Sequence, residues 1–341
     1  MKALVLNKPG ELIMGDMPKP VPGKNELLIK TKAATICTSD LIDIRENPFN
    51  IKLPVILGHE GAGIVEAMGE EVDGFRPGDE VTAHPVIHCG YCWSCKSGYM
   101  HLCDNMDHLG FNMGGVFAEY FVIRADRARK KPDSLSFAHS TLMEPVCVCI
   151  EAIERADVRE GANVLIIGDG PFGIMMAKLC KSYRPAKIIL SGRHDFRLSQ
   201  AGAGVITINE KLVGNAAKAI MEATGSEGID CAIQCAGGAA AVETSIEVLR
   251  SRGTLSLFSG VSSNTPVDLF KVHVKELSIK GSCNDMGYMD KALEMLCDSN
   301  LDLGSVITHT FPFDNWQEAF YQAEKGKSGG LKVSMLANAN K

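Results

Sequence analysis

Three features that would place a chain in a particular class of protein are missing from this sequence. No apolar run approaches the ~20 residues that a membrane-spanning helix needs, so a membrane protein is not expected. The N-terminal stretch alternates between apolar and polar residues and contains no apolar core of a secretory signal. The 35 Lys and Arg are outnumbered by 41 Asp and Glu, so the basic face of a nucleic-acid-binding protein is not expected either. These absences favour a cytoplasmic protein that binds neither membrane nor nucleic acid.

Aromatic residues are also scarce, at 6%, whereas the chain contains 12 cysteines. Because no secretory signal accompanies them, a reducing compartment is expected, in which cysteines serve metal binding and packing rather than a disulfide framework. The length of 341 residues is enough for two domains that each bury a core of their own.

Four of the cysteines, Cys89, Cys92, Cys95 and Cys103, lie within one short segment. Zinc takes four ligands tetrahedrally, and gaps of two residues let a tight turn direct neighbouring sulfur atoms at one point. An iron–sulfur site more often has a three-residue last gap followed by proline, and a nucleic-acid zinc ribbon usually has two separated pairs. The run therefore predicts a closed, structural zinc site.

The pattern of apolar residues changes along the chain. Up to about residue 130 short apolar segments alternate with Gly- and Pro-rich turns, which predicts an irregular β-barrel. From about residue 160 short apolar runs alternate with helix-like segments, which predicts an α/β domain with a parallel, doubly wound sheet. The tail from about residue 286 has helical and strand-like segments, and its pattern does not say which domain it joins.

A glycine-rich loop opens the second part. Gly168, Gly170, Pro171, Phe172 and Gly173 follow a predicted strand and begin a predicted helix. In a dinucleotide fold the first glycine makes the tight turn, the second lets the backbone approach a pyrophosphate, and the third allows close helix–strand packing. The helix N-terminus adds N–H donors and positive potential. The loop therefore predicts a nicotinamide-dinucleotide site.

The second strand of that unit ends without an acidic residue, at Ser191 and Gly192, and Arg193 and Arg197 follow. An NAD site usually presents a carboxylate there to the ribose hydroxyls. Guanidinium groups instead bind a 2′-phosphate through a bidentate fork. We therefore expect NADP(H) in preference to NAD(H). The alternative is that Arg193 is a solvated surface charge and Asp195 binds the ribose.

A second set of metal-ligating residue types is spread over the first 144 positions. Cys37, His59 and Glu60 together form a mixed ligand set that can leave one zinc position open, as catalysis requires. Glu144 is a further candidate ligand. The alternative for Glu144 is an exposed carboxylate at a helix start, with Pro145 marking the turn.

Together these motifs resemble the zinc-containing medium-chain dehydrogenase/reductase superfamily, the alcohol and polyol dehydrogenases. The resemblance rests on the stretch from Cys37, the Gly58-His59-Glu60 triplet with Gly63 and Gly69, the four cysteines, the GGVFAEY stretch, Glu144-Pro145 and the GDGPFG loop. It implies a GroES-like catalytic domain over 1–145 with both zinc sites and a Rossmann domain over 146–285. The segment 286–341 would return to the catalytic domain.

The resemblance also implies roles for individual residues. Cys37 and His59 match catalytic zinc ligands, and Glu60 matches a ligand or an exchangeable partner. Glu144 stands where the third protein ligand falls, as in the sorbitol-dehydrogenase-like branch. Ser39 matches the hydroxyl that relays the substrate proton.

Two further positions bear on that relay. Asp40 matches a residue that orients a zinc ligand, which we expect to be His59. Many relatives have a histidine five residues after the first zinc cysteine, at the end of the proton relay, whereas this chain has Ile42. The relay from Ser39 is therefore expected to take another route.

The expected activity is zinc-dependent hydride transfer between a nicotinamide cofactor and a secondary alcohol or ketone, with a polyol or sugar derivative as the substrate. Two zinc ions per chain are expected, one catalytic and one structural. The alternatives are a threonine-like amino-acid dehydrogenase, which shares the same ligands, and a catalytically weak regulatory member of the family. The resemblance also implies a homo-oligomer, either a dimer or a tetramer.

Overall fold

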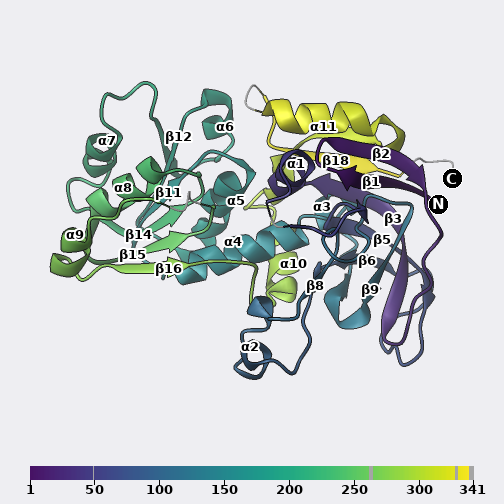
Figure 1. The fold of residues 1–341 in the computed structure, drawn as a ribbon. Coiled ribbons are helices and arrows are strands. Elements are labelled where there is room, and N and C mark those ends of the chain that lie inside the picture. The colour runs from purple at the N-terminus through teal and green to yellow at the C-terminus, as the bar shows by residue number, and fades with distance from the viewer. Residues whose placement is uncertain (49, 261–263, 327–328, 338–341) are drawn as a thin grey trace.

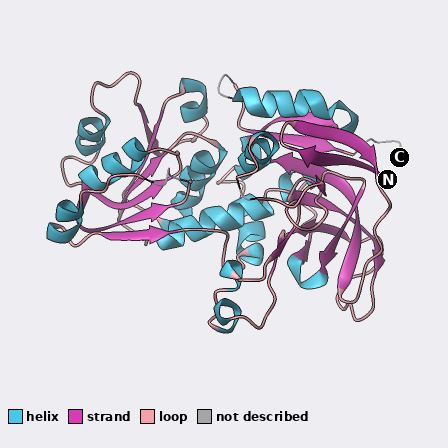
Figure 2. Cartoon of the chain, in the orientation of Figure 1, coloured by secondary structure: helices cyan, strands magenta, loops and turns pink. Residues whose placement is uncertain are grey.

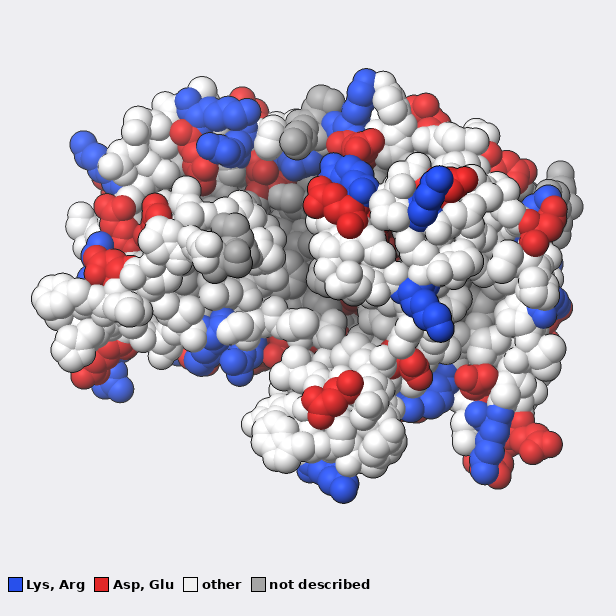
Figure 3. Space-filling model, viewed as in Figure 1, with Lys and Arg blue, Asp and Glu red and all other residues white. Residues whose placement is uncertain are grey.

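The computed structural model describes residues 1–48, 50–260, 264–326 and 329–337, and it divides into two halves (Figure 1). The half on the right of the view is built mainly of strands, and the half on the left has a sheet flanked by helices (Figure 2). The space-filling view is hollowed between the two halves (Figure 3).

The first half is a barrel-like arrangement of mostly antiparallel strands. One sheet has the order β2-β1-β4, a second has the order β10-β6-β5-β3-β18-β17 with β9 also on β3, and β7 pairs with β8. Its N-terminal elements are β1 (Lys2–Lys8), β2 (Glu11–Asp16), β3 (Glu26–Ile36), α1 (Thr38–Arg45), β4 (Val55–Ile56), β5 (Glu60–Met68), β6 (Glu80–Ala83), β7 (Val86–Ile87), α2 (Trp93–Lys96), β8 (Asp107–His108), β9 (Tyr120–Arg124), β10 (Ala128–Lys130) and α3 (Phe137–Ser140). The predicted irregular β-barrel is confirmed.

The second half has one six-stranded sheet, in which every pairing is parallel. Its strand order β13-β12-β11-β14-β15-β16 reverses between β11 and β14, as in a doubly wound fold. The elements are α4 (Met143–Arg155), β11 (Asn163–Ile167), α5 (Pro171–Leu179), β12 (Lys187–Gly192), α6 (Asp195–Ser199), β13 (Val205–Asn209), α7 (Ala216–Ala223), β14 (Ile229–Gln234), α8 (Ala239–Val248), β15 (Leu249–Leu257), α9 (Leu269–Val274), β16 (Ser278–Gly281) and α10 (Met289–Cys297). The predicted Rossmann-type sheet is confirmed.

The C-terminal part of the chain contacts both halves. Helix α10 packs on α4, and its Met289 and Leu293 belong to the core of the second half. The chain then continues through β17 (Ile307–Pro312), α11 (Trp316–Lys325) and β18 (Lys332–Leu336). Strand β18 pairs antiparallel with β3, with Val333 opposite Ile36, so the last strand completes a sheet of the first half.

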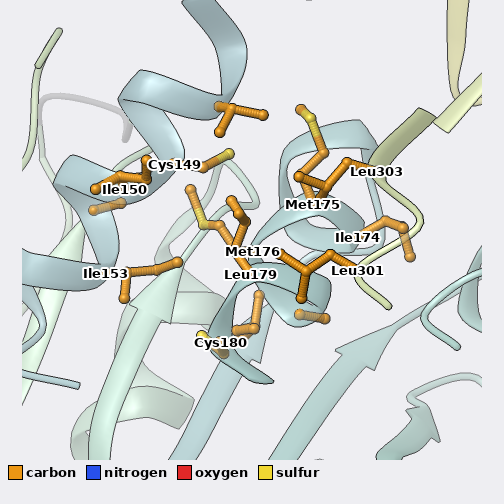
Figure 4. Packing of buried hydrophobic residues seen from close by; sticks show 14 of the residues in the cluster. Cys149, Ile150, Ile153, Ile174, Met175, Met176, Leu179, Cys180, Leu301 and Leu303 are labelled. Carbon is orange, nitrogen blue, oxygen red and sulfur yellow. The ribbon is translucent and has the colours of Figure 1, made fainter. Parts of the chain in front are cut away.

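Helices α4 and α5 form the centre of the largest core (Figure 4). Ile150 and Ile153 of α4 and Met176 and Leu179 of α5 belong to this core, and all four side chains are fully buried. Burial of such a side chain contributes about 1.5–3 kcal/mol. Because α4 also carries Glu144 in its first turn, this packing holds Glu144 rigidly beside the first half. Among the described residues, no helix is long and apolar enough to cross a membrane.

Candidate active site and metal centres

Cys37, His59 and Glu60 lie together in the first half. Their ligand atoms are all within 4.8 Å of one another, and all three residues are buried. The pairing of β3 with β5 brings them together, because Thr35 lies opposite Glu60 and Cys37 follows two residues later. The backbone N–H of Cys37 donates to Asp40 Oδ2 at 2.8 Å at the start of α1, which keeps the thiol at the helix N-terminus.

A close approach of the backbone holds His59 in place. Gly58 has a φ of +92°, and a Cβ there would lie 2.6 Å from the ring of Phe117. A residue with a side chain would therefore be strained and would also clash. Gly58 therefore lets the backbone turn tightly in the barrel core, directly before His59.

Asp40 lies against His59, as expected. Its Oδ1 atom is 3.4 Å from His59 Nδ1, and both side chains are buried. Burial lowers the pKa of His59, but the charge of Asp40 and the thiol of Cys37 outweigh burial, and the pKa stays well above its ordinary value. The contact at Nδ1 leaves Nε2 for a metal.

Glu60 is bound by a lysine from the C-terminal strand. Lys332 Nζ contacts both carboxylate oxygens of Glu60, and the side chains are 2% and 0% exposed. Thr35 Oγ1 donates to the same carboxylate. Burial lowers the pKa of Lys332, yet the charges of Glu60 and Cys37 raise it above the ordinary value. Lys332 therefore stays charged, and it neutralises Glu60.

Glu144 is buried, so it is not the exposed helix-start carboxylate considered as its alternative. It lies outside the 4.8 Å group of Cys37, His59 and Glu60, but the charges of His59 and Glu60 act on it. Burial raises the pKa of Glu144 to about 8. A thiol, an imidazole and two carboxylates buried in one region suit a divalent cation, because the cation would compensate their negative charge.

Ser39 occupies the second position of α1, two residues after Cys37, and is half-buried. Asp43, one turn further along the helix, is buried, and its Oδ1 has no hydrogen-bond partner. Burial and the neighbouring Asp40 raise the pKa of Asp43 to about 6. Ile42, the relay position, is half-buried as well.

The four cysteines form a second cluster, in the loop around α2 at the bottom of Figure 1. The Sγ atoms of Cys89 and Cys95 are 4.0 Å apart, and those of Cys92 and Cys103 are 3.9 Å apart. Sulfur atoms bound tetrahedrally at ~2.3 Å from zinc would be separated by about 3.8 Å. All four are free thiols. The cluster fits zinc and leaves no ligand position open.

The glycine-rich loop has the shape of a phosphate cradle. A Cβ on Gly173 would lie 1.8 Å from the carbonyl oxygen of Gly168, so only glycine permits this packing of α5 on its strand. A Cβ on Gly170 would meet nothing within 4 Å, which leaves open space in front of the helix N-terminus. Pro171 takes the first helical position, with Phe172 after it, and no side chain caps α5. Its free N–H groups suit a pyrophosphate.

The turn after β12 is organised by Asp169 of the same loop. Asp169 Oδ2 accepts from the backbone N–H groups of Arg193 and His194, at 2.7 Å each. Gly192 allows this contact, because a Cβ there would lie 2.5 Å from the Asp169 side chain. The side chain of Arg193 is 68% exposed and lies 3.4 Å from Glu210, which also accepts from Ser191 Oγ.

Arg197 and Asp195, from the short helix α6, already have partners. Arg197 Nε donates to the carbonyl of Gly326, beyond α11, and its side chain is 15% exposed. Asp195 Oδ1 accepts from Asn209 at 2.6 Å. Arg197 therefore links the two halves of the molecule.

Several residues near the site were not found by sequence reasoning. Lys332 has a weak signal, a charged residue at the start of the otherwise apolar strand β18. His108 lies beside His59, and burial together with the charge of His59 lowers the pKa of His108 to about 3. His84 donates to Asp285 and is bound by Arg127, all three being buried. Lys332, His108 and His84 are far apart in sequence, and no sequence motif connects them.

The pair of Lys332 with Glu60 generates a stability prediction. Lys332→Met leaves a buried carboxylate without its cation, which costs about 3–5 kcal/mol, and Glu60→Gln in the same chain should recover much of that loss. Unfolding by urea measures both. Lys218→Met is the control, because its pair with Glu222 is exposed, and it should change stability by less than ~0.5 kcal/mol. Equal losses in the two lysine variants would contradict the prediction.

The sequence matches known families over both halves. Residues 23–133 match the family model of the alcohol dehydrogenase GroES-like domain, and residues 171–297 match that of zinc-binding dehydrogenases. The chain is 34% identical over 340 residues to an L-threonine 3-dehydrogenase of Cronobacter sakazakii, covering 98% of this chain and 99% of the relative. It is 33% identical over 335 residues to that of Shewanella sediminis, covering 96% and 98%.

Solved structures agree. An Escherichia coli CFT073 protein described as a short-chain alcohol dehydrogenase, complexed with NADH, has a TM-score of 0.92 at 26% identity and covers 98% of this chain and 99% of its own. A zinc-binding dehydrogenase of Sinorhizobium meliloti bound to NADP has a TM-score of 0.89 at 26% identity, with 98% of both chains covered. The chain therefore belongs to the zinc-containing medium-chain dehydrogenase/reductase superfamily, and it is a zinc-dependent, NAD(P)-linked dehydrogenase of the alcohol type.

Proposed function

We propose that this dehydrogenase interconverts a secondary alcohol and its ketone, that the substrate is an uncharged polyol or sugar derivative, and that NADP(H) is preferred over NAD(H). The observation that carries the choice of substrate is the charge around the candidate active site. Asp40 and Asp285 are both buried there, and the charge of Asp40 acts on His59 while that of Asp285 acts on Glu144. An anionic substrate would meet repulsion.

The neighbouring cations do not offset this charge for a substrate, because both already have partners. Lys332 is bound to Glu60, and Arg127 is buried against His84. Burial alone would raise the pKa of Asp285, but the charge and hydrogen bond of His84 lower it to about 2, so Asp285 stays ionised. Among the residues that the structure describes, Lys332 and Arg127 are therefore not free to bind an α-carboxylate.

The alternative substrate is L-threonine, which the names of the relatives favour. Its hydroxyl would suit the same ligands, and its ammonium group would suit the negative charge. Its carboxylate is the part that the site does not suit. The proposal therefore ranks threonine second.

Each site residue has a task in this proposal. Cys37, His59 and Glu144 hold the catalytic zinc, and Glu60 is an exchangeable partner of the ion, balanced by Lys332. When bound, zinc supplies Lewis acidity toward the substrate oxygen and the nicotinamide accepts or donates hydride. Ser39 takes the hydroxyl proton, which is general acid–base chemistry at a half-buried position beside Cys37.

The cofactor preference rests on the turn after β12. Asp169 is occupied by the backbone of this turn, and Asp195 is bound to Asn209, so neither carboxylate is free for ribose hydroxyls. The exposed Arg193 guanidinium suits a 2′-phosphate. Gly168, Gly170, Pro171, Phe172 and Gly173 hold the pyrophosphate in this proposal, and Ser191 and Gly192 shape the edge of the adenosine site.

The activity is tested with a substrate panel. Polyols, sugars, secondary alcohols and L-threonine, each with NADP or NAD, should show absorbance growth at 340 nm, and the neutral polyols should give kcat/KM at least ~10-fold above that of L-threonine. The physical reason is the unpaired carboxylate of threonine, whose burial without a partner costs ~1–3 kcal/mol or more. A preference for L-threonine would overturn the choice of substrate and leave the dehydrogenase activity intact.

Metal analysis tests the two centres separately. The purified chain should contain two zinc ions. Cys37→Ser and Cys95→Ser should each contain about one, because each removes a thiolate ligand. Cys37→Ser should lose at least ~100-fold in kcat at unchanged fold, whereas Cys95→Ser should mainly lower the unfolding temperature. Mass spectrometry of the metal and thermal unfolding provide the readouts. One zinc or none in the unsubstituted chain would contradict the proposal.

Arg193→Ala tests the cofactor. Loss of a charged hydrogen bond to phosphate costs about 1.5–3 kcal/mol, so KM for NADP should rise ~10- to 100-fold while KM for NAD changes little. Glu210→Gln, which removes the carboxylate beside Arg193, should lower KM for NADP. Equal effects of Arg193→Ala on the two cofactors would refute the preference.

A further inference from the structure

A loop beside the candidate zinc site, which begins at the end of β8, carries a histidine that the roles above do not use. His108 ends β8, which pairs with β7 through Val86. The backbone N–H of His108 donates to Asn112 Oδ1 at 2.7 Å, and Asn112 Nδ2 donates in turn to the carbonyl of Met106 at 3.1 Å. These two hydrogen bonds join the ends of the loop and fix the backbone of His108 in place.

This loop also packs directly on the segment that carries His59. Gly110 has a φ of +79°, and a Cβ there would lie 2.8 Å from the carbonyl oxygen of Gly58 and 3.0 Å from its nitrogen. The ring centroids of His108 and His59 are 5.7 Å apart. Phe111 packs edge-on against His108 at 4.5 Å. His108 is therefore held rigidly beside His59, one of the candidate metal ligands.

The hydrogen bond at Nδ1 of His108 determines whether Nε2 is a donor or an acceptor. His108 Nδ1 is 2.7 Å from the carbonyl oxygen of Leu109. A carbonyl can only accept, so Nδ1 carries the hydrogen. In the neutral imidazole Nε2 is then a lone-pair acceptor. The hydrogen bonds of His108 among the described residues are made by its backbone and by Nδ1, and the side chain is half-buried, so Nε2 can accept from a bound molecule.

Packing alone does not explain a histidine at this position. A phenylalanine would make the same edge-on contact with Phe111 without bringing a polar nitrogen next to His59. His108 is also outside the 4.8 Å group of Cys37, His59 and Glu60, so the geometry does not make it a further member of that ligand set. An oriented acceptor suits a donor on the substrate.

We propose that His108 Nε2 accepts a hydrogen bond from a hydroxyl group on the carbon next to the one that is oxidised, so that the enzyme selects vicinal diols and polyols over simple secondary alcohols. This inference rests on the proposed function, because it places the reacting oxygen at the Cys37–His59 site. An N–H group on the same carbon has the donor chemistry too, and an amino alcohol without a carboxylate separates the two donors.

The test compares butane-2,3-diol, butan-2-ol and 1-aminopropan-2-ol as substrates of the unsubstituted enzyme and of His108→Phe and His108→Gln. The unsubstituted enzyme should favour the diol over the monoalcohol by about tenfold or more in kcat/KM, the value of one net hydrogen bond. His108→Phe should remove that preference, and His108→Gln should keep part of it because its amide oxygen can accept. His273→Phe, at an exposed position on α9, is the control and should keep the full preference.

A second readout does not need turnover. Saturation-transfer NMR measures the Kd of the diol and of the monoalcohol, and only the diol should bind about tenfold more weakly to His108→Phe. An equal loss for both alcohols, by kinetics and binding, would show a structural role and overturn the inference, as would an unchanged preference. A preference for the amino alcohol over the diol that His108→Phe abolishes would overturn the assignment to a hydroxyl.

The two readouts separate this inference from the proposed function. If no alcohol is oxidised but the diol still binds more weakly to His108→Phe than to the unsubstituted chain, the proposed function fails and the acceptor role of His108 stands. If alcohols are oxidised with equal kcat/KM for diol and monoalcohol, the proposed function stands and the inference fails.

Discussion

The buried ion pair between Lys332 and Glu60 is the interaction on which the arrangement of the active site depends. Glu60 follows directly after His59 and is fully buried, so its carboxylate needs a cation close by. The cation comes from the last described strand, β18, which pairs with β3 and thereby lies beside both Cys37 and Glu60. The C-terminal strand is therefore part of the site, although it is 272 residues away from Glu60 in sequence. This one contact couples the pairing of β18 with β3 to the charge balance of the candidate metal ligands.

The second constraint is the close approach of neighbouring segments at glycine residues, which determines how those segments pack around the candidate site. Gly58 lets the Phe117 ring pack against the backbone directly before His59, and Gly110 brings the loop that contains His108 onto Gly58. The same device recurs in the second half, where Gly173 packs on Gly168 and Gly192 on Asp169. In each place a glycine is required because backbone or side-chain atoms of another residue occupy the position of a Cβ. The two cysteine sets differ in their surroundings: Cys37 lies with one imidazole and one carboxylate, whereas Cys89, Cys92, Cys95 and Cys103 form a group of four thiols.

Local patterns predicted the fold well. The strand–loop–helix around Gly168, the alternation of strands and helices after residue 160, and the strand-rich first part all appear in the structure. These features depend on neighbours in sequence, through side-chain periodicity and turn geometry. The spacing of the four cysteines belongs to the same class, because a single loop brings their sulfur atoms together. The partners of charged residues could not be predicted in this way. The sequence shows an arginine after β12, but it does not show that this arginine pairs with Glu210 or that Asp169 accepts hydrogen bonds from the turn.

The sequence by itself therefore determined the family motifs, the two kinds of domain and the residue types that can bind zinc and a dinucleotide. The tertiary structure decided which of those residues meet, and what surrounds them. It placed Lys332 on Glu60, His84 on Asp285, and His108 beside His59, pairs joined by strand pairing and loop packing rather than by spacing along the chain. The physical reason is that buried charges and hydrogen-bonding groups are satisfied by whatever is near in space, and nearness in space across a barrel and a parallel sheet has no fixed period in the sequence.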